Sequence, residues 1–208
     1  MNGLTTVWLN WIEMLVRLKR IEDVETRSEK PIAGASVKDA AAGHNETVAE
    51  KLLHPAALGV LVPGMNKHFY SSGAFNLIQL LFYLLRQTGP AHLFLTTYSI
   101  SMESINAIRR KLDKGELLSV RFLIDNRVRS ISPKPFDYLI NSFPGCYRCC
   151  AMHAKVALLY NDTWTVDLVG SQNATHNPKL ERGIIHTDPD IFRFDLKMLE
   201  DEFDKGTT

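Results

Sequence analysis

His153 and Lys155, followed by Ser171 and Asn173, are the residues of this chain whose types and spacing best suit chemistry. Residues two apart on a β-strand point to the same face. We therefore expect His153 and Lys155 to share one strand face, and Ser171 and Asn173 to share another. An ammonium group neutralises negative charge, hydroxyl and amide groups donate hydrogen bonds, and an imidazole titrates near neutral pH. This combination of side chains suits a phosphate group.

A hairpin would bring these four side chains together. Alternating apolar residues predict one strand over residues 147–160 and a second over residues 163–171. The polar sequence N-D-T at residues 161–163 is expected to form the turn between them. Antiparallel pairing about this turn would place the strand ends that carry the four side chains next to each other.

The elements around this hairpin are typical of an α/β domain. Ser101 is a plausible N-cap of one helix, and residues 65–73 are expected to form a loop that carries His68. Strand and helix patterns alternate, which predicts a mixed β-sheet flanked by helices. Further strands are expected at residues 58–62, 92–98, 117–124 and 182–186, and helices at residues 75–87, 102–114, 135–143 and 190–203.

The first quarter of the chain has a different composition. An apolar stripe at spacings of three and four predicts a helix over residues 4–25, which we expect to pack on the core or on a second copy. Residues 26–54 are rich in small and charged residues, which is typical of a linker or loop, although residues 45–53 could form a short helix. We therefore divide the chain into an N-terminal helix with a flexible linker, residues 1–57, and a second domain, residues 58–208.

Charge is unevenly distributed along the chain although the net charge is only +1. Residues 109–155 hold ten Lys or Arg against four Asp or Glu, a balance of +6, whereas residues 181–204 hold eight acids against three bases, a balance of −5. A basic segment that leads into a phosphate-type cluster favours a polyanionic substrate, although such a segment is also typical of a solvated face.

Neither a membrane span nor a metal site is expected. The longest apolar stretch, residues 75–85, is too short to cross a bilayer, and the N-terminus lacks the pattern of a signal peptide, so we expect a cytoplasmic protein. Cys146, Cys149, Cys150 and His153 spell C-x2-C-C-x2-H, which leaves zinc as an alternative. Zinc sites usually combine two such half-sites, so we favour reduced thiols and no metal.

The motifs of this chain resemble those of the phospholipase D superfamily. H-A-K at residues 153–155 and G-S-Q-N at residues 170–173 are similar to the family signature, H-x-K followed by G-S-x-N. L-F-L-T-T-Y-S-I-S, a helix and V-R-F-L-I-D-N resemble the first βαβ unit of its small bacterial endonucleases, and H-N-P-K-L-E-R-G-I-I resembles their acidic segment, with Glu181 as the acid. The likeness covers residues 58–203. The acid that follows H-x-K in the family falls on Tyr160 here, and the nearest acid is Asp162.

This resemblance implies a phosphodiesterase that needs no cofactor or metal. His153 would attack phosphorus and form a phosphohistidine. Lys155, Ser171 and Asn173 would stabilise the phosphoryl oxygens, and Glu181 would orient the His153 ring. Family members with a single motif pair two subunits, so the resemblance implies a homodimer in which a second histidine protonates the leaving oxygen.

Nucleic acid, DNA or RNA, is the expected substrate, and two alternatives stay open. One is a catalytically weak or inactive nucleic-acid-binding module of the same fold. The other is a phospholipase or phosphatidyl transferase. The binding module would use arginines on phosphates: Arg109, Arg110, Arg127 and Arg129. Four further residues are weaker candidates for the site, and an ordinary structural role would also explain each of them. They are His68 at the substrate rim, His176 in a loop, Asp125 at a strand end and Asp162 in the turn.

Overall fold

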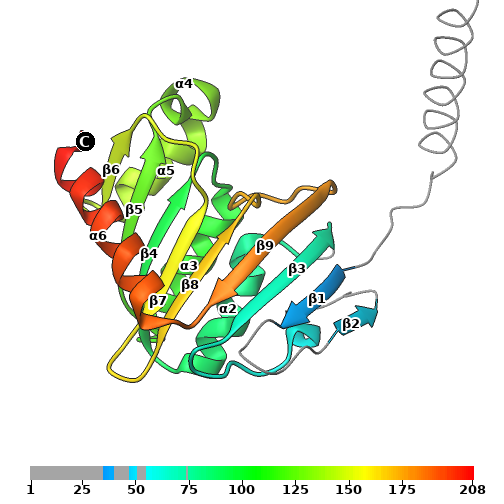
Figure 1. The fold of residues 1–208 in the computed structure, drawn as a ribbon. Coiled ribbons are helices and arrows are strands. Elements are labelled where there is room, and N and C mark those ends of the chain that lie inside the picture. Colours follow the sequence, from blue (N-terminus) through cyan, green and yellow to red (C-terminus); the bar gives the residue numbers. More distant parts are fainter. Residues whose placement is uncertain (1–34, 40–46, 51–54, 74) are drawn as a thin grey trace, which may run out of the picture. The chain divides into compact units, whose positions relative to one another are not determined.

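A computed structural model describes residues 35–39, 47–50, 55–73 and 75–208. The compact unit described here runs from Ala33 to Thr208. The helix expected over residues 4–25 lies outside the described residues. Within the described part, nine strands form one sheet in the order β2-β1-β3-β9-β8-β7-β4-β5-β6 (Figure 1). The strands are β1 Ala35–Asp39, β2 Thr47–Glu50, β3 Asn66–Ser72, β4 Ala91–Thr97, β5 Leu117–Asp125, β6 Tyr147–Cys150, β7 Val156–Tyr160, β8 Thr165–Gly170 and β9 Leu180–His186.

The sheet is mixed and is flanked by helices, as the alternation of patterns predicts. β4, β5 and β6 are parallel neighbours, whereas every other neighbouring pair is antiparallel. A strand with a parallel neighbour needs a crossover connection, and a helix supplies it between β4 and β5. The helices are η1 Pro55–Leu58, α2 Leu77–Thr88, α3 Met102–Asp113, α4 Val128–Ile131, α5 Pro133–Ser142 and α6 Pro189–Lys205.

Apolar side chains cover both faces of the central strands. Leu93 and Leu95 of β4 belong to the larger core cluster, which also holds the buried residues of α2, α3 and α5. Phe94 points to the opposite face and packs in a second cluster with Phe192 and Leu199 of α6. α6 therefore lies on the sheet face opposite α2 and α3 (Figure 1). Because both faces are covered, β4 reads as a continuous apolar run rather than an alternating one.

Local capping signals define where the helices begin. Asn76 caps α2 and forms a capping box with Gln79, in which each side chain accepts a hydrogen bond from the other's backbone N–H. The Ser101 hydroxyl accepts a hydrogen bond from the Ser104 N–H, which confirms the predicted N-cap of α3. The Asp188 carboxylate accepts a hydrogen bond from the Asp190 N–H at the start of α6.

The prediction of a strand over residues 58–62 followed by a loop over residues 65–73 was wrong, because the strand comes second. Residues 59–62 are irregular, and the expected loop is the strand β3, which pairs with β9 along its whole length. Burial alternates along β3, but two of its inward-facing residues are the polar Lys67 and Ser71. The polar side chains on the buried face hide the strand pattern in the sequence. Residues 35–39 and 47–50 also form strands within the expected linker, so a short helix over residues 45–53 was wrong.

The single strand expected over residues 147–160 is two strands. β6 pairs in parallel with β5, whereas β7 pairs antiparallel with β4 and β8. The chain must cross from one place in the sheet to another between them, and residues 151–155 leave the regular strand to do so. His153 and Lys155 therefore precede β7 rather than lying on it. The expected hairpin turn is correct, since Tyr160 of β7 pairs with Thr165 of β8.

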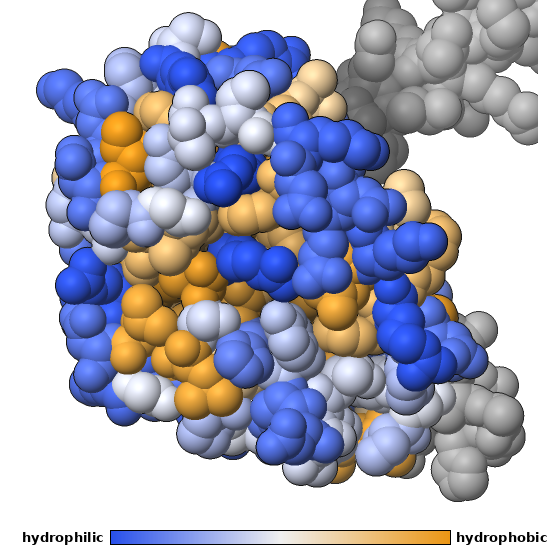
Figure 2. Space-filling model, turned by 90° about the vertical axis from the view of Figure 1, so that its left-hand side faces the viewer, coloured by the Kyte–Doolittle hydropathy of each residue, from blue (hydrophilic) through white to orange (hydrophobic). Residues whose placement is uncertain are grey.

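Apolar surface is exposed among hydrophilic patches on the side of the domain that carries α6 (Figure 2). Phe194 and Met198 of α6 are 65% and 47% exposed, and Leu180 at the start of β9 is 68% exposed. Such residues are common singly on protein surfaces, but Leu180 directly precedes the predicted site residue Glu181. No helix in the described part of the chain is long and apolar enough to cross a membrane.

One buried carboxyl group lies between the sheet and α6. Asp167 of β8 is fully buried, and neither of its carboxyl oxygens has a hydrogen-bond partner among the described residues. Burial, together with the neighbouring Asp195 carboxyl of α6, raises the pKa of Asp167 to about 9 from its ordinary value of 3.8. The folded protein therefore keeps Asp167 protonated at neutral pH, because a charged carboxylate is costly to bury.

Asp167 should make the fold less stable as the pH rises. Between about pH 4 and pH 9 the folded state holds a proton that the unfolded state releases, so the free energy of unfolding falls by up to about 1.4 kcal/mol per pH unit from this group. Asp167→Asn removes this dependence, so its stability relative to wild type should increase from pH 5 to pH 8 in urea unfolding. Asp162→Asn, the same substitution in the exposed turn, is the control. An Asp167→Asn effect equal at both pH values would contradict the assignment.

Candidate active site

The predicted site residues meet at one edge of the sheet. The carboxyl ends of β4, β5 and β8 and the amino ends of β7 and β9 come to this edge because β7 is antiparallel to both β4 and β8. His153 and Lys155 lie just before β7, and Ser171 and Asn173 lie just after β8. Glu181 is the second residue of β9, which begins two residues earlier than the strand expected over residues 182–186. The sheet topology thus gathers residues that are up to 28 positions apart in sequence.

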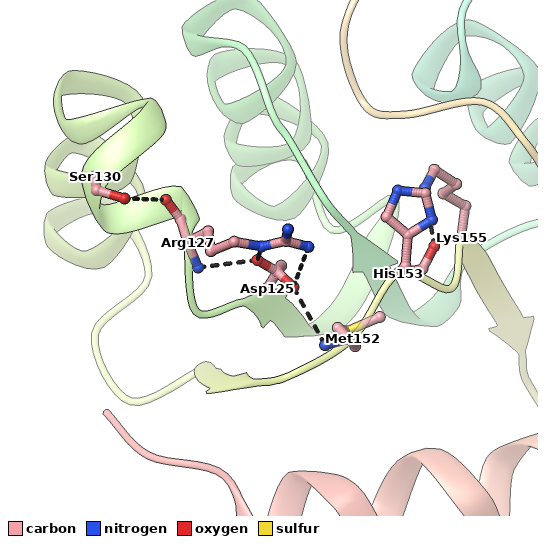
Figure 3. A network of polar contacts seen from close by, with 6 residues as sticks. All are labelled: Asp125, Arg127, Ser130, Met152, His153 and Lys155. Atoms are coloured by element: carbon pink, nitrogen blue, oxygen red, sulfur yellow. Dashed lines mark hydrogen bonds and ion pairs between the residues drawn. The ribbon is translucent and has the colours of Figure 1, made fainter.

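His153 and Lys155 are in direct contact (Figure 3). The Lys155 Nζ lies 3.3 Å from the His153 Nδ1 and donates a hydrogen bond of 2.9 Å to the His153 carbonyl oxygen. His153 is exposed, whereas Lys155 is only 8% exposed. The Tyr98 ring packs beside both, 5.2 Å from the His153 ring centroid and 5.8 Å from the Lys155 Nζ. The imidazole is accessible to a ligand while its neighbours hold it in place.

The charge of Lys155 is set by burial and by two carboxylates. Burial lowers the pKa of the Lys155 ammonium, and the charges of Glu181 and Asp125 oppose this shift. An amine buried without a partner loses its proton more readily, whereas a nearby carboxylate favours the charged form. A phosphate oxygen that binds at this position would add a further negative charge and stabilise the ammonium.

Ser171 is placed by the close pairing of β8 and β9. The Ser171 N–H donates to the Arg182 carbonyl oxygen at 2.9 Å, and the Arg182 N–H donates to the Ser171 Oγ at 3.0 Å. On the other side of β8, the Gly170 N–H donates to the Lys155 carbonyl oxygen at 3.0 Å. These backbone contacts connect the two halves of the motif, so the position of Lys155 and that of Ser171 are fixed together.

Gly170 is required by this close approach. A Cβ atom at position 170 would lie 2.8 Å from the Arg182 carbonyl oxygen and 3.3 Å from the Gly183 Cα. Both obstacles are backbone atoms, which cannot move without separating β8 from β9. The glycine of G-S-Q-N is therefore explained by packing, and it allows Ser171 to reach its position.

Glu181 joins Ser171 to a residue that the sequence analysis did not select. The Ser171 hydroxyl donates to the Glu181 Oε2, and the Asn177 Nδ2 donates to the Glu181 Oε1 at 2.6 Å. Glu181 is 7% exposed, so these two donors compensate a nearly buried carboxylate. Asn177 stands before a proline in H-N-P-K, which indicates a turn but not a contact with Glu181.

Glu181 and His153 are not joined by a hydrogen bond in the described structure. The resemblance implies that Glu181 orients the His153 ring, but both oxygens of Glu181 bind the neighbours named above, and the His153 Nδ1 faces Lys155. Asn173 lines a small hollow with Glu181 and Asn177, and its Oδ1 is buried without a partner among the described residues. Glu181 therefore positions Ser171 in this arrangement.

Asp125 and Arg127 form a second polar network beside His153 (Figure 3). The Asp125 Oδ1 accepts hydrogen bonds of 2.9 Å from the backbone N–H and the Nε of Arg127, and its Oδ2 accepts one of 3.3 Å from the Met152 N–H. Burial alone would raise the pKa of Asp125, but these hydrogen bonds and the Arg127 charge lower it. Asp125 thus caps the turn after β5 and also connects this turn to the segment that carries His153.

The other candidates lie apart from these contacts. His68 lies on β3, where its Nδ1 is 3.2 Å from the Arg182 Nη2, and His176 is exposed in the loop after β8. Asp162 is exposed in the hairpin turn. Tyr160, in the family's acid position, stacks on His92 and packs against Phe192, so an aromatic contact occupies that place. No three His, Cys, Asp or Glu side chains within the described residues are placed to hold a metal ion.

Two solved structures share this arrangement of strands and helices. Nuc from Salmonella typhimurium, described as a phospholipase D family member, has a TM-score of 0.51 and 19% sequence identity over 68% of this chain and 95% of its own. A polyphosphate kinase from Porphyromonas gingivalis has a TM-score of 0.51 and 15% identity over 69% of this chain but only 26% of its own. No protein-family model matches the sequence, and no curated protein matches it significantly. This chain has the fold of the phospholipase D superfamily.

Gly170→Ala should weaken the site by separating β8 from β9. The added Cβ meets backbone atoms at 2.8 and 3.3 Å, so the strands must shift, and we expect a loss of about 1–3 kcal/mol in the free energy of unfolding. Urea unfolding measures this loss, and amide hydrogen exchange at Ser171 and Arg182 should increase at the same time. Ala154→Gly, at an exposed neighbouring position, is the control. Unchanged exchange at these two amides would contradict the packing argument.

Proposed function

We propose that this protein is a phosphodiesterase that cleaves nucleic acid without a metal, with His153 as the nucleophile. The observation that carries the proposal is the exposed His153 imidazole in contact with the nearly buried Lys155, at the sheet edge where Ser171 and Glu181 also lie. An exposed nucleophile beside a cation is what attack on a phosphodiester needs. The phospholipase D fold and the resemblance to small endonucleases support the same reading.

The reaction would proceed in two displacements. An unprotonated His153 nitrogen attacks phosphorus, the P–N bond forms, and the P–O bond to the leaving group breaks. Water then attacks the phosphohistidine, which releases the second product and restores the imidazole. Lys155 and Ser171 would bind non-bridging oxygens, on which negative charge builds in both transition states.

Substrate binding would also prepare the His153 ring. Because the Nδ1 faces the Lys155 ammonium, a neutral ring in this arrangement carries its proton on Nε2. A phosphate oxygen that attracts the Lys155 Nζ would draw this cation away from Nδ1. The nitrogen lone pair that Lys155 now faces would then be free for reaction. The nearly buried Lys155 ammonium would thus bind the phosphate and, before the substrate arrives, keep the Nδ1 lone pair of His153 from reacting.

A second copy of the chain would complete the site. Breaking the P–O bond requires a general acid for the leaving oxygen, and the chain holds one H-x-K motif. A twofold homodimer with the two His153 side chains facing each other would supply that acid. The exposed position of His153 and the exposed apolar Leu180 beside Glu181 support an interface at this edge.

His153→Asn should abolish phosphodiester cleavage. The substitution removes the nucleophile and keeps a polar side chain of similar reach, so kcat/KM for a labelled oligonucleotide should fall by about 10³-fold or more. The assay is run in EDTA with wild type, His153→Asn and His176→Asn. His176 is an exposed loop histidine outside the proposed mechanism, so its variant should keep wild-type activity.

Four outcomes of this assay and of matched binding and lipid-release assays are informative. The proposal fails if wild type in EDTA cleaves neither an oligonucleotide nor bis(p-nitrophenyl) phosphate, or if His153→Asn is as active as wild type. Salt-dependent oligonucleotide binding without cleavage would instead support a binding module of the same fold, which the aromatic Tyr160 at the acid's position favours. Release of headgroup from phosphatidyl vesicles, without cleavage of oligonucleotides, would support a lipid substrate.

Cysteine crosslinking should detect the proposed dimer. Ala154 is exposed and adjacent to His153, so Ala154→Cys should place two thiols near the twofold axis. A short bis-maleimide should then give a covalent dimer on a denaturing gel, and light scattering should give twice the chain mass. Lys197→Cys on α6 and the wild-type protein, with its three cysteines, are the controls. A monomer by light scattering with no specific crosslink at position 154 would contradict the dimer.

A further inference from the structure

An open pocket of about 510 Å³ adjoins His153. Its volume falls within the range of known small-molecule sites. The walls come from the segment after β5 and the segment before β7, which the Asp125 network connects. The lining residues are Asp125, Asn126, Arg127, Ala151, Met152 and His153. His153 thus forms one side of this pocket, and Arg127 is the one Lys or Arg that lines it within the described part of the chain.

Arg127 is exposed but is held in a fixed orientation. Its side chain is 61% exposed, yet its Nε lies 2.9 Å from the Asp125 Oδ1 and its guanidinium carbon lies 4.9 Å from the centre of the Tyr98 ring. The guanidinium group extends over Asp125 toward His153 (Figure 3). An arginine that is already ordered loses little side-chain entropy when it binds an anion.

Asp125 does not use all of the donors of Arg127. The carboxylate engages the Nε and, at 3.4 Å, the Nη2 of Arg127. Guanidinium carries five N–H donors, so N–H groups remain that can bind a phosphate oxygen in the pocket. Asp125 also accepts from the Met152 N–H, the neighbour of His153 in sequence. One nearly buried carboxylate therefore fixes the spacing between Arg127 and the proposed nucleophile.

We propose that Arg127 binds the phosphate next to the scissile one, so that the site selects a strand with consecutive phosphodiesters. This inference rests on the proposed function, because His153 marks the scissile phosphate. Nucleic acid repeats its phosphates along a chain, whereas a phospholipid headgroup offers one phosphodiester. The pocket between His153 and Arg127 would accept the nucleoside that joins the two phosphates. Arg127 is thus a specificity-determining residue that favours nucleic acid.

The first test measures binding rather than cleavage. The ligand is a fluorescein-labelled thymidine hexanucleotide, and all proteins carry His153→Asn so that the ligand is not consumed. Adding Arg127→Gln should raise Kd about tenfold and reduce the slope of log Kd against log salt by about one. Arg193→Gln removes the same charge from an exposed position on α6 and should leave Kd and slope unchanged. Equal Kd and equal slope for the Arg127→Gln protein and its parent would overturn the proposal.

A second test changes the ligand instead of the protein. A hexanucleotide with methylphosphonates at every linkage but one keeps a single charged phosphate. Arg127→Gln should weaken its binding much less than that of the fully charged strand. The same fold-loss for both ligands would overturn the proposal, because Arg127 would then contact the retained phosphate or act only through overall charge.

A conservative variant and a check of folding separate the loss of a phosphate contact from a loss of structure. Arg127→Lys should give an intermediate loss because it keeps the charge but not the fork of donors, and circular dichroism shows whether each variant is folded. If neither variant folds, the parent protein alone decides: equal affinity for the two ligands overturns the proposal. Absence of cleavage by wild type would refute the proposed function, whereas these binding results bear on Arg127 alone.

Discussion

The antiparallel pairing of β7, β8 and β9 is the interaction on which the candidate site depends. Gly170 donates from its backbone to the Lys155 carbonyl oxygen, and Ser171 exchanges hydrogen bonds with Arg182. These contacts fix the positions of the segments that carry Lys155 and Ser171, which lie at opposite ends of the β7–β8 hairpin in sequence. They are possible because a residue without a Cβ stands where β8 approaches β9 most closely. A small change in strand separation would move both the cationic and the hydroxyl parts of the site.

Three nearly buried charged residues with defined partners lie at the same sheet edge as the exposed histidine. Lys155 contacts His153, Glu181 accepts from Ser171 and Asn177, and Asp125 accepts from Arg127 and Met152. Removing one partner from such a group is costly, because the charge that remains is still shielded from water. These hydrogen bonds orient the charged side chains at the sheet edge before any ligand binds. Preorganised groups of this kind are effective in stabilising charge that develops during a reaction.

The fold and the site support the functional proposal at different levels. A likeness to Nuc at 19% identity shows a shared architecture, and one architecture can serve several chemistries. The side chains at the sheet edge, above all the His153–Lys155 contact, support the proposal of phosphodiester cleavage. The pocket that Arg127 and His153 share supports the proposal of a nucleic-acid strand as substrate. In this proposal the substrate class depends on Arg127, which lies outside the signature motif.

The sequence alone determined the α/β class, the cap of α3 and the hairpin turn, and it selected the residues of the family signature. These features depend on neighbours in sequence, such as the Ser101 hydroxyl and the Ser104 N–H. The sequence did not reveal β3, because Lys67 and Ser71 put polar residues on its buried face. It also joined β6 and β7 into one strand, because alternation does not show which neighbour a strand pairs with. The partners of Glu181, the pocket beside His153 and the orientation of Arg127 were decided only by the tertiary structure, since they arise where strands from distant parts of the chain end together.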